Sequence, residues 1–227
     1  MIVNPNYANA LKDETWSIKS LFQDFPERKF TKGEHVFKLN DTGNNILLID
    51  SGQVLSYSYD KVKKWKFAND YFIENQFINL EILDINYPRN NFAIATTNSV
   101  VKEIPLLVFY KKLNNTPTLQ HWITQVLLKK SQKHLLRWHR MTTLSSQDRI
   151  FYFLIEQVKD IGERIGYEWL IRNKLSMTQI GELTHTSRQT ASTQLNRLKK
   201  EGIIHFRGSK YLIIRDLEKL KAIANYS

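Results

Sequence analysis

Residues 176–215, with the sequence SMTQIGELTHTSRQTASTQLNRLKKEGIIHFRGSKYLIIR, constrain the fold of this chain more than any other stretch. Ser176 and Gln179 have the spacing of a capping box, which predicts that a helix starts there. Thr186 and Gln189 have the same spacing and predict a second helix after a short turn. Each predicted helix has apolar residues at helical spacing, namely Ile180 and Leu183 in the first and Ala191, Leu195 and Leu198 in the second.

The opposite face of the second predicted helix is polar. It carries side chains suited to base edges and phosphates, namely Arg188, Gln189, Ser192, Thr193 and Asn196. Two helices with such a face predict a helix-turn-helix, whose second helix lies in the DNA major groove. The apolar runs 203–206 and 211–214 surround Arg207-Gly208-Ser209-Lys210 and predict a wing, a β-hairpin with a basic tip. The alternative is a helical hairpin with a solvated polar face.

The distribution of charge favours the DNA-binding interpretation. From Leu170 to the end of the chain there are eleven basic and four acidic residues, a net charge of +7. The whole chain carries +11, so about a quarter of its residues hold most of the excess charge. A concentrated basic region of this kind is what contact with phosphates requires.

Composition excludes several other classes of protein. A chain of 227 residues with 42% hydrophobic content predicts a folded protein of two domains. No apolar run approaches the length of a membrane span, and residues 1–16 lack the pattern of a signal peptide. The absence of cysteine excludes disulfides, a cysteine nucleophile and cysteine-ligated iron–sulfur clusters. We therefore expect a cytoplasmic protein with no membrane partner.

The sequence pattern of the first half of the chain is typical of a small β domain. A short helix is expected within the first 25 residues, packing by Leu11, Trp16, Ile18, Leu21 and Phe22. From Phe30 to about Ile104, runs rich in Val, Ile, Phe and Tyr alternate with turn signals such as Lys32-Gly33 and Asp50-Ser51-Gly52. This spacing predicts an antiparallel sandwich or jelly roll. A short helix is expected at 106–113.

Residues 117–141 predict one long helix of roughly 37 Å. Its apolar stripe consists of Leu119, Trp122, Ile123, Val126, Leu127, Leu135 and Trp138. Such a helix is too long for one small sandwich to cover, so we expect the stripe to form a dimer interface; the alternative is packing on its own domain alone. Residues 142–146 interrupt the pattern and predict a hinge, followed by a helix over 146–158 with Ile150, Phe153 and Leu154 inward.

This order of parts resembles the Crp/Fnr family of bacterial transcription regulators from about residue 25 to residue 220. The motifs that carry the resemblance are Lys32-Gly33-Glu34, Gly52-Gln53-Val54, Asp148-Arg149-Ile150, Gly181-Glu182-Leu183, Thr186-Ser187-Arg188-Gln189-Thr190 and Glu201-Gly202-Ile203-Ile204. The resemblance implies an α+β fold. Its parts are an N-terminal antiparallel β-roll or jelly-roll sensor domain (1–116), a dimerisation helix and hinge (117–144), and a winged helix-turn-helix DNA-binding domain (145–227).

The resemblance also implies a homodimer on an inverted repeat of double-stranded DNA. Base contacts fall on Arg188, Gln189 and Thr193. The family usually has glutamate in place of Gln189 and arginine in place of Thr193, so we expect a half-site poorer in G·C at those positions. Phosphate contacts are expected from Ser176, Thr178, Ser187, Thr190, Arg207 and Lys210. An activator of this family also contacts RNA polymerase.

The expected effector pocket departs from the family pattern. Relatives that bind cyclic nucleotides use a Gly-Glu pair and an Arg-Ser or Arg-Thr pair, where this chain has Glu74-Asn75 and Arg89-Asn90. Without the glycine the backbone cannot approach a ribose and phosphate as closely. Glu74, Asn75, Arg89 and Asn90 are the candidate pocket residues, although an exposed loop arginine is the favoured interpretation of Arg89. We expect that cyclic AMP does not control the protein.

No other chemistry is indicated by the sequence. The six histidines lack metal-ligand spacing, and there is no nucleophile elbow or phosphate-binding glycine loop, so we expect no metal, no cofactor and no enzymatic activity. Two alternatives stay open. One is a regulator gated by a cyclic nucleotide or haem in the β-roll. The other is a small-molecule-binding β-roll protein with non-specific affinity for nucleic acid.

Overall fold

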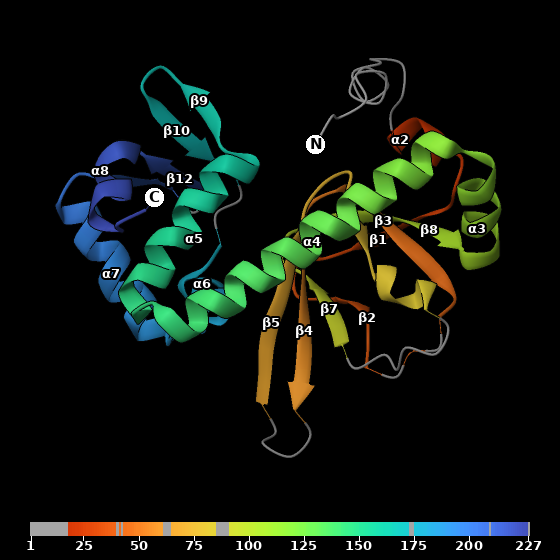
Figure 1. Cartoon of the computed structure of the whole chain (residues 1–227), viewed down its shortest axis with the longest axis horizontal. Helices are drawn as coiled ribbons and strands as arrows, with labels where there is room; N and C mark the ends of the chain where they lie inside the picture. The colour runs from red at the N-terminus through yellow and green to blue at the C-terminus, as the bar shows by residue number, and fades with distance from the viewer. Residues whose placement is uncertain are drawn as a thin grey trace, which may run out of the picture. The chain divides into compact units, whose positions relative to one another are not determined.

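The computed structural model describes residues 18–39, 41, 43–60, 65–84, 91–172, 175–208 and 210–226. The chain divides into two compact units, Met1–Gln132 and Lys133–Ser227 (Figure 1). The boundary falls inside the long helix α4, Pro117–Thr143, so the first part of α4 belongs to one unit and its last turns to the other.

The first unit is built on two four-stranded antiparallel sheets. One has the order β1-β8-β3-β6, with β1 at Glu27–Phe30, β8 at Ser99–Pro105, β3 at Asn45–Ser51 and β6 at Phe77–Ile78. The other has the order β2-β7-β4-β5, with β2 at His35–Phe37, β7 at Asn91–Ala95, β4 at Val54–Asp60 and β5 at Trp65–Phe72. The strands run from Glu27 to Pro105, which confirms the antiparallel sandwich predicted for residues 30–104.

Two apolar clusters form the core of this unit. The first includes Phe30, Leu47, Val54 and Ile78, all nearly inaccessible to solvent. Residues of two α-helices and one 3-10 helix contribute to the second cluster. These are α2 at Ile18–Leu21, η1 (the 3-10 helix) at Leu80–Leu83 and α3 at Leu106–Asn115. Phe22 lies at its centre, with its ring 5.8 Å from that of Phe109 and nearly parallel to it. Leu11 and Trp16 lie outside the described residues.

Gly52 determines the turn between β3 and β4. Its φ is +91°, a conformation that favours glycine, and an added Cβ would collide with the side chain of Ser99 and the carbonyl of Asn98. A larger residue would therefore separate the β3–β4 turn from β8.

The long helix agrees with its prediction, but the hinge after it is shorter than expected. Helix α4 continues through Thr142 and Thr143, and α5 already begins at Ser146 and ends at Ile161. Ser145 caps α5, since its Oγ accepts a hydrogen bond of 3.1 Å from the backbone N–H of Asp148. The connection is therefore residues 144–145 instead of 142–146. Thr142 and Thr143 stay in the helix, and their hydroxyls donate to the carbonyl of His139 one turn earlier.

The second unit contains a helical layer against a four-stranded sheet. Helix α6 spans Met177–Thr184, α7 spans Arg188–Lys200 and α8 spans Leu217–Ile223. The sheet has the order β11-β12-β10-β9, with β11 at Ile204–Arg207, β12 at Tyr211–Ile214, β10 at Glu168–Ile171 and β9 at Glu163–Ile165. The β11–β12 hairpin was predicted. The β9–β10 hairpin was missed, because every residue of β9 is exposed and gives no alternating pattern.

Candidate DNA-binding surface

Helix α6 starts where the sequence predicts. The backbone N–H of Gln179 donates to Ser176 Oγ at 3.2 Å, and the N–H of Ser176 donates to Gln179 Oε1 at 2.8 Å. Both halves of the capping box are therefore formed. The helix ends at His185, whose φ of 51° is left-handed.

Helix α7 starts one residue later than the second predicted capping box. Its N-cap is Ser187, whose Oγ accepts from the N–H of Thr190 at 2.9 Å. The expected cap, Thr186, instead places its hydroxyl 3.0 Å from that of Thr184. The reason lies in the turn: an added Cβ on Gly181 would lie 3.0 Å from the Thr186 carbonyl, so Thr186 packs closely against α6 and cannot cap α7.

The three predicted base-contact residues share the outward face of α7. Ala191, Leu195 and Leu198 are completely buried on its other face. Arg188, Gln189 and Thr193 are all exposed. Asn196 lies on the same outward face and donates to Ser192 Oγ at 3.4 Å. The structure thus brings the predicted set together on one surface of a helix whose opposite side is anchored in the core.

The predicted phosphate-contact residues lie in three places. Ser176 and Thr178 are exposed at the start of α6, Ser187 and Thr190 stand at the start of α7, and Arg207 and Lys210 are exposed at the tip of the β11–β12 hairpin. Ser187 Oγ and Thr190 Oγ1 lie 2.8 Å apart. The starts of helices carry N–H groups that favour negative charge, so the first two places complement phosphates.

Only part of the positive charge of this unit is available to an external anion. Arg197 is held by Glu201 at 2.8 Å and by Gln147 at 3.0 Å, and Arg215 is paired with Glu168 at 3.3 Å. Arg188 and the two wing residues, by contrast, have no ion-pair partner among the described residues. The cations without an ion-pair partner in the described part of the chain therefore include Arg188 on α7 and both basic residues of the wing tip.

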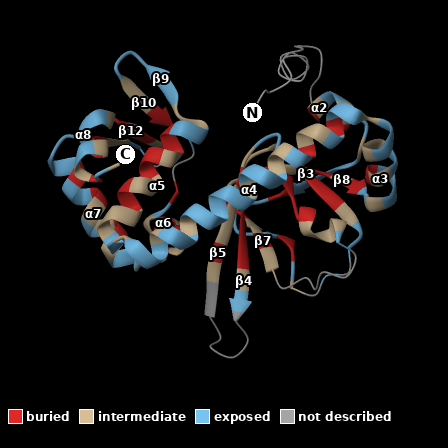
Figure 2. Cartoon of the chain, in the orientation of Figure 1, coloured by how far each residue is buried: buried red, intermediate tan, exposed pale blue. Residues whose placement is uncertain are grey.

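The predicted dimer stripe on α4 divides into a buried and an exposed part. Leu119 and Ile123 are buried in the core of the first unit, and Trp122 and Val126 pack partly against it. Their own domain thus covers Leu119 and Ile123, which leaves these two no surface for a partner, whereas Trp122 and Val126 are only partly covered and stay predicted interface residues. Further along, Leu127 is 42% exposed, Leu135 63% and Trp138 66% (Figure 2). Leu128, Leu136 and Met141 are exposed as well and were not predicted.

Comparison with known proteins agrees with this architecture. Residues 148–223 match the Crp-like helix-turn-helix domain. Electron transport regulator A of Shewanella oneidensis is 24% identical over 203 residues, which cover 88% of this chain and 80% of that protein. An anaerobic regulatory protein of Haemophilus influenzae is 26% identical over 200 residues, covering 86% of this chain and 75% of that one.

Solved structures share the fold of the whole chain. A mutant of CooA from Carboxydothermus hydrogenoformans matches with a TM-score of 0.75 and 21% identity, covering 99% of this chain and 98% of that one. FixK2 from Bradyrhizobium japonicum matches with a TM-score of 0.74 and 16% identity, covering 87% and 96%. Residues 148–223 therefore belong to the Crp-like helix-turn-helix family, and the whole chain is similar to regulators of the Crp/Fnr type.

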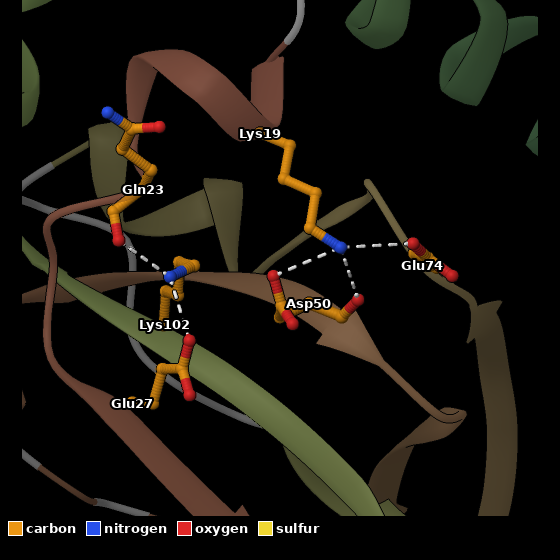
Figure 3. Close-up of polar contacts among 6 residues, drawn as sticks. All are labelled: Lys19, Gln23, Glu27, Asp50, Glu74 and Lys102. Carbon is orange, nitrogen blue, oxygen red and sulfur yellow. Dashed lines mark hydrogen bonds and ion pairs between the residues drawn. The ribbon is translucent and has the colours of Figure 1, made fainter.

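Of the four candidate effector residues, the structure describes only Glu74 and Asn75, and the pocket itself stays a prediction. Glu74 and Asn75 are exposed in the turn between β5 and β6. The Nζ of Lys19, from α2, lies 3.2 Å from Glu74 Oε1 and 3.4 Å from Asp50 Oδ1 (Figure 3). Asn75 has a φ of 64° and donates its N–H to the carbonyl of Ile49 at 2.9 Å. Both residues therefore shape a turn, whereas Arg89 and Asn90 lie outside the described residues.

The pairing shown in Figure 3 ties the N-terminal helix to the roll. Lys102, whose side chain is only 5% exposed, donates to the carbonyl of Gln23, just after α2, at 2.8 Å and to Glu27 at 3.0 Å. Glu74 therefore acts as one anchor of α2.

Sequence reasoning missed a polar cluster beneath α4 in the first unit. Lys130 Nζ lies 3.3 Å from Glu81 and 3.4 Å from Asp70, and Asn91 donates to Glu81 at 3.5 Å. Burial acts to lower the pKa of Lys130, but the attraction of Glu81 and Asp70 outweighs it, so the pKa is raised. A charged lysine thus ties α4 to β5 and η1. Lys130 is not a member of the predicted apolar stripe of α4, and the sequence gives no sign of its partners.

Two other sequence predictions concern absences. Among the described residues, no group of three or more potential metal ligands occurs. None of the described helices has the length and apolar character needed to cross a membrane.

Proposed function

We propose that this protein is a sequence-specific DNA-binding transcription regulator that acts as a homodimer on an inverted repeat. One observation carries the proposal. Helix α7 buries its apolar face completely and exposes a face of arginine, amide and hydroxyl side chains, and the hairpin that follows it has a basic tip. In a helix-turn-helix, this second helix lies in the major groove and its first residues meet the base edges. Regulatory proteins are among the relatives that match most of the chain.

The base-contact residues predict an unusual half-site. Gln189 presents an amide, which pairs with adenine N6 and N7, and Thr193 presents a methyl and a hydroxyl, which suit the thymine methyl. Glutamate and arginine, common in the family at these positions, would select cytosine and guanine. We therefore propose a half-site poorer in G·C at the two positions that these residues face.

The phosphate contacts supply affinity without sequence preference. The hydroxyls at the starts of α6 and α7 fix the register of the helices on the DNA backbone, and Arg207 and Lys210 reach a neighbouring phosphate from the wing. Loss of one such cation weakens binding to all sequences about equally and reduces the salt slope by about 1.

The exposed part of α4 is the proposed dimer interface. Leu127, Leu135 and Trp138 recur at intervals that place them near one face of the helix, beyond the region that its own domain covers. Adjacent exposed leucines and a tryptophan are costly in water, so pairing with a second α4 is favourable. A two-fold dimer then presents two copies of α7 to successive major grooves, about 34 Å apart.

The proposed regulator is not controlled by cyclic AMP. The glycine that lets a backbone approach a ribose is absent, and Glu74 is occupied by Lys19 at 3.2 Å. Isothermal titration calorimetry with cyclic AMP tests this directly, and binding at micromolar concentration would overturn it. The same titration with haem tests the ligand-gated alternative.

A cytoplasmic location and the absence of enzymatic activity follow from this role. If the protein activates transcription, RNA polymerase is its direct partner.

Selection of binding sites from random DNA, followed by fluorescence anisotropy with excess competitor, tests the main proposal. We expect an inverted repeat bound at least about 10³-fold more tightly than random DNA. A lower ratio would favour a protein with non-specific nucleic-acid affinity. Recovery of the usual G·C-rich half-site would contradict the proposed roles of Gln189 and Thr193 but leave DNA binding intact.

A further inference from the structure

Arg149, in the first turn of α5, contacts the ends of two other helices at once. Its Nε donates to the carbonyl of Thr184 at 3.0 Å and its Nη2 to that of His185 at 3.1 Å, at the C-terminal end of α6. Its Nη1 donates to the carbonyl of Leu144 at 3.1 Å and to that of Met141 at 3.5 Å, at the end of α4. One guanidinium therefore joins the ends of α4 and α6.

The chemistry of these contacts makes the junction stiff. The last carbonyls of a helix have no partner within the helix and carry its partial negative charge. A guanidinium is planar and always charged, and its donors point in fixed directions. A single side chain that satisfies carbonyls of two helices therefore restricts both the distance and the angle between them.

A second contact joins the same two elements. Arg137 Nη2, on the last turns of α4, lies 3.2 Å from Nε2 of His185. Burial, together with the positive charges of Arg137 and Arg149, lowers the pKa of His185 to about 4. The imidazole is therefore neutral at ordinary pH, and its Nε2 accepts a hydrogen bond from Arg137.

The turn that Arg149 holds leads directly into the recognition helix. His185 is followed by Thr186 and by Ser187, the N-cap of α7. The backbone around Thr186 and Ser187 passes so close to Gly181 that even a Cβ there would be tight. The turn has little freedom of its own, so the position of α7 relative to the end of α4 depends on the contacts of Arg149.

We propose that Arg149 is a positioning residue that sets the separation of the two recognition helices in the dimer, and hence the half-site spacing that the protein accepts. The inference rests on the proposed function, in which α4 carries the two-fold axis. Because the dimer is two-fold symmetric, a change in the angle between α4 and α7 occurs in both subunits and alters the separation of the two α7 helices twice. Half-sites one turn apart have centres about 34–36 Å apart, or roughly 10 to 10.5 base pairs. Each inserted base pair therefore moves one half-site by about 3.4 Å and rotates it around the DNA axis.

The test measures affinity against operator spacing. Full-length wild type, Arg149→Gln and Arg149→Lys are titrated by fluorescence anisotropy against the selected operator and against versions with one or two base pairs inserted or removed. An isolated half-site serves as a further probe. Arg172→Gln is the control: it removes the same charge from a residue that pairs with Glu163 at 2.6 Å, on the β9–β10 hairpin.

We expect wild type and Arg172→Gln to prefer the native spacing by at least about tenfold, equivalent to about 1.4 kcal/mol. Arg149→Gln should bind the native operator about tenfold more weakly, with a spacing preference reduced to about threefold or less, and bind the isolated half-site like wild type. Arg149→Lys keeps the positive charge but loses the several fixed N–H donors of the guanidinium, so its spacing preference should lie between those of wild type and Arg149→Gln.

The outcomes separate the proposals. If wild type shows no spacing optimum, the dimeric function fails. If wild type has an optimum and both Arg149 variants keep it unchanged, Arg149 does not position the helices. If the Arg149 variants lose half-site affinity as much as operator affinity, the residue merely supports the fold of α7, and the inference is again overturned. Should Arg149→Gln not fold, the lysine variant alone decides between these results.

Discussion

His185 makes the stability of the second unit depend on pH in the acidic range. The pKa of His185 is lowered from 6.5 to about 4, first by burial and then by the charges of Arg137 and Arg149. Between these two values the unfolded chain binds a proton that the folded unit does not. The stability contributed by the neutral imidazole is therefore fully present above pH 6.5 and is lost as the pH falls towards 4.

The size of this effect follows from the linkage relation. For one group with these two pKa values, moving from pH 7 to pH 5 removes roughly 1.8 kcal/mol of unfolding free energy. His185 is only about half buried, so solvent screening reduces the expected loss to about 1 kcal/mol. For a unit of this size, 1 kcal/mol corresponds to a shift in Tm of about 4–8 °C.

The measurement compares wild type with His185→Asn. Asparagine tolerates the left-handed backbone of residue 185, whose φ is 51°, and does not titrate in this range. Urea unfolding at pH 7 and pH 5 gives the loss for each protein, and carboxylates common to both cancel in the difference. Wild type should lose about 1 kcal/mol more than the variant. Equal losses, or a larger loss in the variant, would refute the assigned burial and charge environment of His185.

Three further predictions concern other parts of the chain. Lys130→Met leaves two carboxylates without their shared cation and should lower the unfolding free energy by about 3 kcal/mol, measured by urea denaturation; a change below about 0.5 kcal/mol would mean that water already compensates the pair. Gln189→Glu should transfer selection at its base pair from adenine to cytosine by about 1–3 kcal/mol, and an unchanged selected site would remove residue 189 from the base contacts. Trp138→Glu should shift sedimentation from dimer to monomer, whereas exposed Tyr167→Glu should not; a dimeric Trp138 variant would place the interface elsewhere.

The helix boundaries illustrate what local sequence encodes well. The capping box of α6 and the apolar stripe of α4 depend on residues three to four positions apart, so their consequences appear in the chain itself. The start of α7 was misplaced by one residue because Thr186 and Ser187 are both good caps. Only the close packing of the turn on Gly181 selects between them.

The functional residues show the same division. The outward set on α7 could be predicted because the buried residues of that helix define its faces by periodicity. The pairing of Glu74 could not, because its partner Lys19 comes from an element 55 positions away. The Lys130 cluster and the Arg149 junction likewise join side chains from separate elements and have no periodic signature.

By itself, the sequence determined the type and order of most elements, though not the β9–β10 hairpin or α8, together with the basic character of the C-terminal unit and the polar face of α7. These properties arise from propensity, periodicity and charge, which act over a few neighbouring residues. The tertiary structure alone decided which part of the α4 stripe its own domain covers, which carboxylates Lys19 and Lys130 neutralise, and how Arg149 joins the ends of α4 and α6. Each of these depends on distances between residues far apart in the chain, and such distances exist only once the chain has packed.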